Sequence, residues 1–186
     1  MFLCLLIICF GGSAVLGGVY LITYQPIANA QAAKVNQALA GVLPEFDNVP
    51  AEEAYQIQVD GRAVTVYPAK KAGLFEGAAV EAVTTKGFGG PITLMVGFKA
   101  DGTIYNTAVI SHSETPGLGD KMDPKKSDFS LQFKGKNPGT FKLAVTKDGG
   151  QVDAITAATI SSRAFCDAVD LAYRAFRQVA QKGGDQ

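Results

Sequence analysis

The stretch "PITLMVGFKADGTIYNTAVIS" (residues 91–111) contains two runs rich in apolar and β-branched residues, one on each side of Asp101-Gly102. An Asp-Gly pair between such runs is typical of a β-hairpin, because tight hairpin turns need residues that tolerate a positive φ. The stretch therefore predicts two neighbouring antiparallel strands, and with them an antiparallel sheet at the centre of the fold.

The segment before this hairpin predicts further strands. In "AYQIQVDGRAVTVYPAK" (54–70), apolar residues alternate with polar ones on both sides of Asp60-Gly61, which indicates another hairpin. "AVEAVTTK" (79–86) predicts one more strand, and the loop Gly87–Gly90, "GFGG", separates it from the central hairpin. This loop lacks the spacing of a nucleotide-binding fingerprint or a P-loop.

The segment after residue 139 predicts a third hairpin. "TFKLAVTK" (140–147) and "QVDAIT" (151–156) are both strand-like in composition, and Asp148-Gly149-Gly150 between them is a turn signal. We therefore expect these two runs to pair as antiparallel strands.

The end of the chain repeats apolar residues every three or four positions, which indicates an amphipathic helix. These residues are Phe165, Ala168, Val169, Ala172, Phe176 and Val179. Gly183-Gly184, directly after Lys182, predicts the end of this helix. Strand-rich segments between helices predict an α+β fold, in which helices pack on a curved antiparallel sheet.

The N-terminus predicts a single transmembrane helix. Residues 1–24 carry no charge, and the first charged residue is Lys34. As a helix, Phe2–Ile22 would extend about 30 Å, which is enough to cross the apolar core of a bilayer. Tyr20 and Tyr24 are placed where aromatic side chains meet the membrane surface.

Two other interpretations of the N-terminus are cleavage and lipidation. "ANA" (28–30) resembles a signal-peptidase site and would leave Gln31 first, and Cys9 is a candidate lipid attachment site. The apolar run is longer than a usual signal core and has no basic residues before it, and Ile8 stands where a lipoprotein needs a small residue. We therefore favour an uncleaved anchor.

The chain divides by composition into a transmembrane anchor (1–24), a linker with a short helix (25–50) and a single folded domain (51–186). The short helix is expected over Gln31–Leu43, and Pro44–Pro50 ends it. About 136 residues are enough to bury one hydrophobic core.

Composition excludes several classes of function. The chain has 17 basic and 17 acidic residues, so it lacks the basic character that nucleic-acid binding requires. Its three cysteines form no CxxC pair, and His112 is the single histidine. These residues do not supply the usual ligand set of a zinc or iron–sulfur site.

Two segments concentrate groups that could bind a ligand. "DAITAATISS" (153–162) places four hydroxyls and one carboxylate at the start of the predicted C-terminal helix. The hydroxyls could cap the helix, or they could surround an anion, since helix N-termini favour negative charge. "SHSETPGLGDKM" (111–122) leaves a strand and bends at Pro116 and its glycines, so it is either a plain turn or a flat approach for a ligand.

The combination of "SETPGLGDKM" with "DAITAATISS" resembles the FMN-binding domain of the ion-pumping electron-transfer complexes. In that family a threonine of the motif Asp-x-x-Ser/Thr-Gly-Ala-Thr is joined to FMN through a phosphoester. "GFGGPI" (87–92) is more similar to the G subunit of the Rnf complex than to the C subunit of the sodium-pumping NADH:quinone reductase. The residues that match the motif are Asp153, Thr156, Ala158 and Thr159, and Ala157 stands where glycine is usual.

The resemblance implies a set of FMN-binding residues. Thr159 would carry the covalent FMN, and Ser161 and Ser162 would donate hydrogen bonds to the phosphate. Leu118 would pack on the isoalloxazine ring. The polar edge of the ring would meet Glu114, Thr115 and the backbone of Gly117 and Gly119. If the motif needs a positive φ at Ala157, alanine is costly there.

The function that the resemblance implies is electron relay within a membrane-bound, ion-translocating ferredoxin/NAD oxidoreductase of the Rnf type. The partners would be the other membrane subunits and a flavin transferase that attaches FMN. The chain would cross the inner membrane once, with its domain on the extracytoplasmic side, and would not act alone.

Three alternative functions are open. The chain could be the C subunit of a sodium-pumping NADH:quinone reductase, or an anchored module that binds a ligand without catalysis. A serine hydrolase at Ser111 or Ser161 is disfavoured, because the chain has no G-x-S-x-G elbow.

Overall fold

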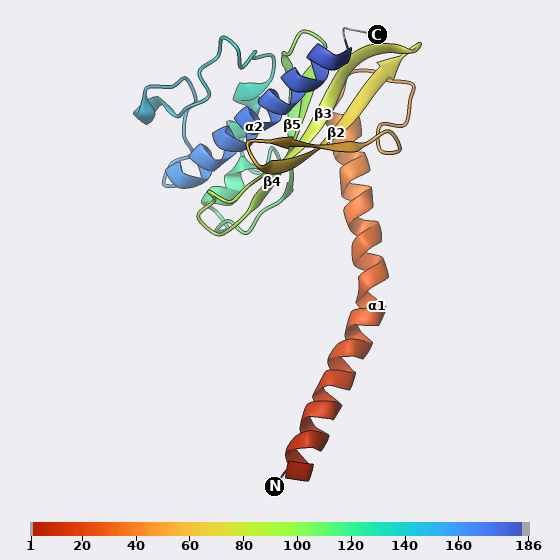
Figure 1. Cartoon of the computed structure of the whole chain (residues 1–186). Helices are drawn as coiled ribbons and strands as arrows, with labels where there is room; N and C mark the ends of the chain where they lie inside the picture. Colours follow the sequence, from red (N-terminus) through yellow and green to blue (C-terminus); the bar gives the residue numbers. More distant parts are fainter. Residues whose placement is uncertain (1, 184–186) are drawn as a thin grey trace. The chain divides into compact units, whose positions relative to one another are not determined.

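The structure, a computed structural model, describes residues 2–183. Contacts between Cα atoms divide it into two units, the first ending at Asn36 and the second beginning at Gln37. Figure 1 shows the elements in chain order, from α1 through the sheet to α2.

The first unit consists of most of helix α1 (Phe2–Val42). None of its described side chains is buried, although most of those before residue 28 are apolar. Within residues 2–183, α1 is the one helix long and apolar enough to cross a membrane. The composition of this segment is therefore that of a lipid-facing helix rather than of a core helix.

α1 is continuous, which corrects the expectation of an anchor followed by a separate short helix at 31–43. Pro26 lies inside it. A proline removes one backbone hydrogen bond, and the alanines and glutamines of residues 28–40 are strong helix formers, so the helix continues to Val42.

The second unit is built on a five-stranded antiparallel sheet in the order β1-β2-β3-β4-β5. Each strand pairs with the next along the chain, as successive hairpins do. The strands are β1 (Tyr55–Val59), β2 (Arg62–Lys71), β3 (Leu74–Thr84), β4 (Ile92–Lys99) and β5 (Ile104–Ser111). The predicted hairpins at 54–70 and 91–111 are confirmed.

Helix α2 (Thr159–Gly183) covers one face of the sheet, chiefly over β3 and β4 (Figure 1). Phe176 of α2 stacks on Phe98 of β4 with ring centroids 4.9 Å apart. Phe165 packs against Phe129 and Phe133 from the connection after β5. These rings form the centre of the core, and the α+β prediction is confirmed.

The opposite face of the sheet receives the last turns of α1. Leu39 and Val42 are buried there, and Asn106 of β5 donates a hydrogen bond from Nδ2 to the carbonyl oxygen of Gly41 at 3.0 Å. The end of α1 therefore belongs to the folded unit.

The connection between β5 and α2 contains the 3₁₀ helices η1 (Gly119–Met122), η2 (Asp128–Phe133) and η3 (Thr146–Asp148). The predicted third hairpin over 140–156 is wrong. Val145 and Val152 form a single parallel bridge, and both side chains are fully buried. This bridge, with the N–H of Thr146 donating to the carbonyl oxygen of Val152 at 2.9 Å and the N–H of Val152 donating to that of Ala144 at 3.0 Å, holds the segment in place of an antiparallel ladder.

The end of α2 agrees with the predicted stop at Gly183. The second glycine of that prediction, Gly184, lies outside the described residues.

Candidate functional site

A cavity of about 340 Å³ lies where three segments meet: the loop between β3 and β4, the loop after β5 and the first turn of α2. Eight of the residues expected to bind FMN line it, together with Phe88 and Ile160. The full lining is Phe88, Glu114, Thr115, Leu118, Gly119, Ala157, Ala158, Thr159, Ile160 and Ser161. Two segments more than 30 residues apart in sequence thus form one site.

Glu114 joins the three segments. Its carboxylate accepts a hydrogen bond from the backbone N–H of Gly89 at 3.0 Å and from the hydroxyl of Ser161 at 2.5 Å. The side chain is almost fully buried. Because a buried carboxylate is costly unless its oxygens accept hydrogen bonds, this arrangement fixes Glu114, and with it the walls of the cavity.

The loop after β5 bends sharply before and after Glu114. The backbone N–H of Glu114 donates to Nδ1 of His112 at 3.1 Å, so this histidine supports the turn. At Gly119, any Cβ would overlap the Glu114 carboxylate and the Ser161 hydroxyl. Glycine is therefore required for the loop to pass this close to the hydrogen-bonded pair.

The entrance of α2 is a β-turn over residues 155–158. The N–H of Ala158 donates to the carbonyl oxygen of Ile155 at 3.0 Å, and Ala157 has φ +62°. A positive φ in the third position of a turn favours glycine, because a Cβ is disfavoured there. The structure therefore gives a physical reason for the glycine that is usual in this motif.

The two serines of the motif have different surroundings. The hydroxyl of Ser162 accepts from the N–H of Ile155 at 2.9 Å and donates to the carbonyl oxygen of Ala158 at 3.0 Å. It is fully buried and does not line the cavity. Ser162 thus holds the turn together and is not placed to donate to a phosphate in the cavity.

Ser161 does line the cavity, but its hydroxyl proton is directed at Glu114. A hydroxyl has one proton, so in this arrangement Ser161 presents only an acceptor to a ligand. This differs from the expectation that it donates to phosphate.

Asp153 and Thr156 line a different cavity, of about 400 Å³, with residues of η1 and η2. Gln132 holds this segment: its Oε1 accepts from the N–H of Asp153 at 2.8 Å, and its Nε2 donates to the carbonyl oxygen of Asp153 at 3.1 Å. Gly117 lines neither cavity and has φ +78° in the turn of its loop. The structure therefore does not bring these three expected residues to the Thr159 site.

η1 connects the two cavities, and an ion pair holds it. Nζ of Lys126 lies 2.6 Å from Oδ2 of Asp120, and this hydrogen bond lowers the pKa of the Asp120 carboxyl. Asp120 is buried, directly after Gly119 of the first cavity and before Lys121 of the second. The ion pair thus keeps the segment between the two cavities in place.

The described residues contain few groups of the kinds that bind metals or react as thiols within the folded unit. Within residues 2–183, no group of three or more His, Cys, Asp and Glu side chains could hold a metal ion. Burial raises the pKa of the Cys166 thiol to about 12, so this thiol stays protonated at neutral pH.

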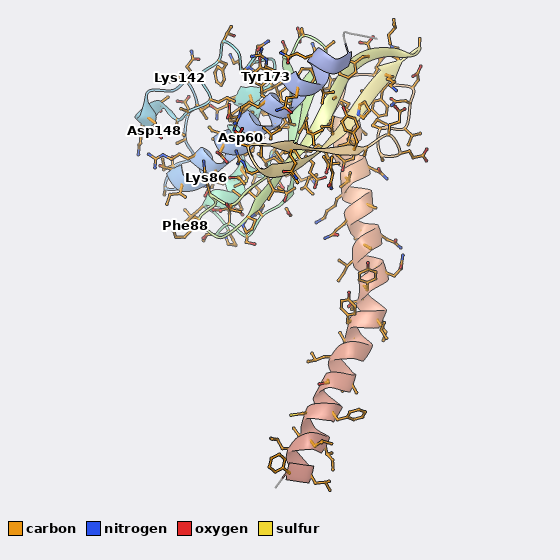
Figure 2. The ribbon with its side chains drawn as sticks, viewed as in Figure 1. Asp60, Lys86, Phe88, Lys142, Asp148 and Tyr173 are labelled. Carbon is orange, nitrogen blue, oxygen red and sulfur yellow. The ribbon has the colours of Figure 1, made fainter. Side chains whose placement is uncertain are left out.

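Phe88 is a site residue that the sequence analysis did not name. It is 70% exposed and lies on the loop between β3 and β4, at the margin of the folded unit (Figure 2). The pattern that could have identified it in the sequence is an aromatic residue with a glycine on each side in a surface loop. In such a loop an apolar side chain cannot reach the core.

The cavity fits FMN. Its volume is within the range of small-molecule sites, and its apolar walls suit a flat aromatic ring. Thr159 is half-buried in the first turn of α2, where free backbone N–H groups and the helix dipole favour a phosphate. Glycine at 119 leaves the backbone free of a side chain beside this space.

Comparisons with known proteins agree with this assignment. Residues 87–174 match the family model of the FMN-binding domain. The chain is 36% identical over 168 residues to the G subunit of the ion-translocating oxidoreductase complex of Stutzerimonas stutzeri, covering 86% of this chain and 73% of that protein. The corresponding protein of Vibrio atlanticus is 36% identical over 167 residues, covering 84% and 79%.

A third relative, the G subunit of the same kind of complex from Cereibacter sphaeroides, is 40% identical over 148 residues, which cover 76% of this chain and 67% of that protein. The matched family segment begins at the loop of Phe88 and contains every residue of the 340 Å³ cavity. Similarity of this extent identifies the chain as a member of the family of G subunits of ion-translocating oxidoreductase complexes, with an FMN-binding domain.

Proposed function

We propose that this chain carries FMN through a phosphoester on Thr159 and relays electrons between other subunits of an Rnf-type complex. The observation that supports the attachment most directly is the position of Thr159. It lies in the first turn of α2 and lines the same cavity as the loop Glu114–Gly119. A phosphate on this hydroxyl would leave the ring beside the apolar walls.

Different residues of the cavity would hold different parts of the cofactor. Thr159 provides the attachment point, and the N-terminus of α2 stabilises the negative charge of the phosphate. Leu118, Ile160 and Phe88 supply apolar surface that excludes water. When bound, FMN supplies the redox chemistry. The attachment through phosphate leaves the ring chemically unmodified.

The role of a relay follows from what the sequence contains. The chain has no nicotinamide-binding fingerprint and no set of cysteines for an iron–sulfur cluster. Electrons must therefore come from one partner and go to another. The relatives are named as subunits of a complex, which supports partners of this kind. Maturation would need a flavin transferase.

Residues 1–24 are proposed as the membrane anchor, residues 25–50 as the linker, of which residues 37–42 pack on the sheet, and residues 51–186 as the FMN-binding domain. The exposed apolar surface of α1 supports the anchor. We place the domain on the extracytoplasmic side of the inner membrane. A covalent bond is useful there, because FMN lost from the protein could not easily be replaced.

The attachment is tested by intact mass of the full chain purified from membranes. We expect a mass above that of the bare chain by one FMN less one water. We also expect flavin fluorescence that stays with the band in a denaturing gel. A bare mass with FMN released by denaturant would support the alternative of a non-covalent binding module.

The side of the membrane is tested with a cysteine in place of Leu74, which is 71% exposed and is the first residue of β3. We expect an impermeant thiol reagent added outside the cytoplasm to label Leu74→Cys. Cys4 and Cys9 are replaced by serine in every variant, and Cys166, which is buried, provides an internal control. Labelling from the cytoplasmic side alone would show that the domain has the opposite orientation. An N-terminal sequence that begins at Gln31 would show that the anchor is cleaved off.

A further inference from the structure

Three large apolar side chains gather at the mouth of the Thr159 cavity. Phe88 is 70% exposed, Ile160 48% and Leu118 41%, and each comes from a different segment. Single exposed apolar residues are common on protein surfaces, but a cluster around one cavity indicates a ligand or partner that covers it.

The backbone of the Phe88 loop is held tightly. Its N–H at Gly89 donates to the buried Glu114 carboxylate at 3.0 Å. A Cβ on Gly89 would overlap the carbonyl oxygen of Ser113, and a Cβ on Gly87 would overlap that of Gly90. The loop therefore lies directly on residues 113–114, and glycine at these positions makes that contact possible.

Phe88 is the single side chain that this loop presents, because the other three residues of Gly87–Gly90 are glycines. Figure 2 shows it at the edge of the folded unit, and it lines the cavity that contains Thr159. A flat phenyl ring on a fixed backbone, beside an attachment point for a flat cofactor, has the chemistry of an aromatic stacking contact.

We propose that Phe88 is a positioning residue that packs its ring on the isoalloxazine of the bound FMN, and that Glu114 holds Phe88 in place through Gly89. This inference rests on the proposed attachment at Thr159. The contact would limit the orientations of a cofactor that is otherwise tethered only by its phosphate, and it would cover the exposed phenyl ring.

The aromatic residues of the chain make this contact measurable. The chain has no tryptophan, and none of its six tyrosines lines the cavity. Tryptophan and tyrosine quench flavin fluorescence by electron transfer when they touch the ring, whereas phenylalanine does not. A tryptophan or tyrosine at position 88 therefore reports whether this side chain touches the flavin.

The experiment uses the full chain in detergent, with one FMN per chain verified by intact mass for every variant. We expect Phe88→Trp and Phe88→Tyr to lose most of the flavin fluorescence of the folded protein and to regain it in SDS. Leu74→Trp is the matched control, since Leu74 is equally exposed and lies outside the cavity. Its fluorescence should equal that of the unmodified chain.

Full FMN occupancy with unchanged fluorescence in both Phe88 variants would overturn the stacking contact. Phe88→Tyr differs from the native residue by one hydroxyl, so it keeps the test valid if tryptophan does not fit. An unmodified chain without covalent FMN would instead contradict the proposed attachment. The two failures are thus distinguished by mass.

The role of Glu114 is tested in the Phe88→Trp background. Glutamine keeps an oxygen that can accept from Gly89, so Glu114→Gln should retain the quenching. Glu114→Ala removes the acceptor, so the loop is released and a large part of the fluorescence should return. Equal quenching in both double variants, with FMN attached, would contradict the role of Glu114 as the support of Phe88.

Discussion

The two halves of the segment 153–162 have different surroundings, although they form one continuous motif. Residues 157–161 line the 340 Å³ cavity together with the loop 114–119. Asp153 and Thr156 line the 400 Å³ cavity beside η2. The β-turn with Ala157 at φ +62° separates them, because it changes the direction of the chain just before α2 begins. Spacing in a motif therefore does not by itself place all of its residues in one site.

The largest expected effect separates the two threonines. Thr159→Val and Thr156→Val each remove one hydroxyl and keep the shape of the side chain. We expect Thr159→Val to lose all covalent FMN and Thr156→Val to keep it, because only Thr159 lines the first cavity. Intact mass and in-gel fluorescence measure both. Flavin that persists in Thr159→Val and maps to Thr156 would reverse our assignment of the two halves.

The next effect concerns the turn between the halves. In Ser162→Ala, the buried N–H of Ile155 loses its acceptor, so the free energy of unfolding should fall by about 1–3 kcal/mol. Thr156→Ala is the control: this side chain is exposed, and the change should stay within about 0.5 kcal/mol. Chemical denaturation followed by circular dichroism compares them. Equal stability of the two variants would show that Ser162 does not hold the turn.

A charge placed at the first cavity tests whether this cavity faces the flavin. Leu118→Asp places a carboxylate at the first cavity and should lower the reduction potential of FMN, because it disfavours added electrons. At an effective dielectric constant of about 20 and a separation of about 8 Å, the Coulomb cost is about 2 kcal/mol per added negative charge. Leu131→Asp, from exposed Leu131 in η2, is the control and should leave the potential nearly unchanged.

A redox titration of the full chain in detergent, with complete FMN occupancy in each variant, measures this difference. High salt should reduce the shift, because the introduced charge is partly exposed. An unchanged potential in Leu118→Asp would show that the loop after β5 does not face the ring. A shift of equal size in Leu131→Asp would show that the flavin is not confined to the first cavity.

The smallest effect concerns Ala157 itself. Ala157→Gly removes the strain of an alanine in the left-handed region, which is roughly 1–2 kcal/mol. Glycine also raises the conformational entropy of the unfolded chain, which lowers the free energy of unfolding by about 0.4–1 kcal/mol. We expect a gain in stability of up to about 1 kcal/mol. Ala154→Gly, at a position without positive φ, should instead lose stability. Equal losses in the two variants would contradict the conformational role of position 157.

Local patterns predicted the sheet and the last helix. Asp60 and Gly61 both adopt positive φ, as does Gly102, so the turns of the first two predicted hairpins form where the sequence places them. The apolar repeat from Phe165 to Phe176 faces the core as expected. These features depend on residues that are neighbours in the chain, which is why sequence patterns detect them.

Two segments differ from prediction, one because of tertiary contacts and the other because of local helix propensity. The strand-like runs of 140–156 form only one parallel bridge, between Val145 and Val152, and both of these side chains are buried in the core. α1 continues through Pro26, because one missing hydrogen bond does not end a helix of strong helix formers.

The sequence alone determined the chemical groups of the site: a threonine at a helix N-terminus, a glycine-rich loop after a strand and an apolar anchor. Only the tertiary structure decided which of these groups meet. The hydrogen bond between Glu114 and Ser161 spans 47 positions, and it excludes Ser161 as a donor. Tertiary packing also places Phe88 at the cavity and directs the Ser162 hydroxyl to the backbone of the turn instead. Contacts of this kind depend on how the sheet and α2 pack, and local periodicity carries no information about them.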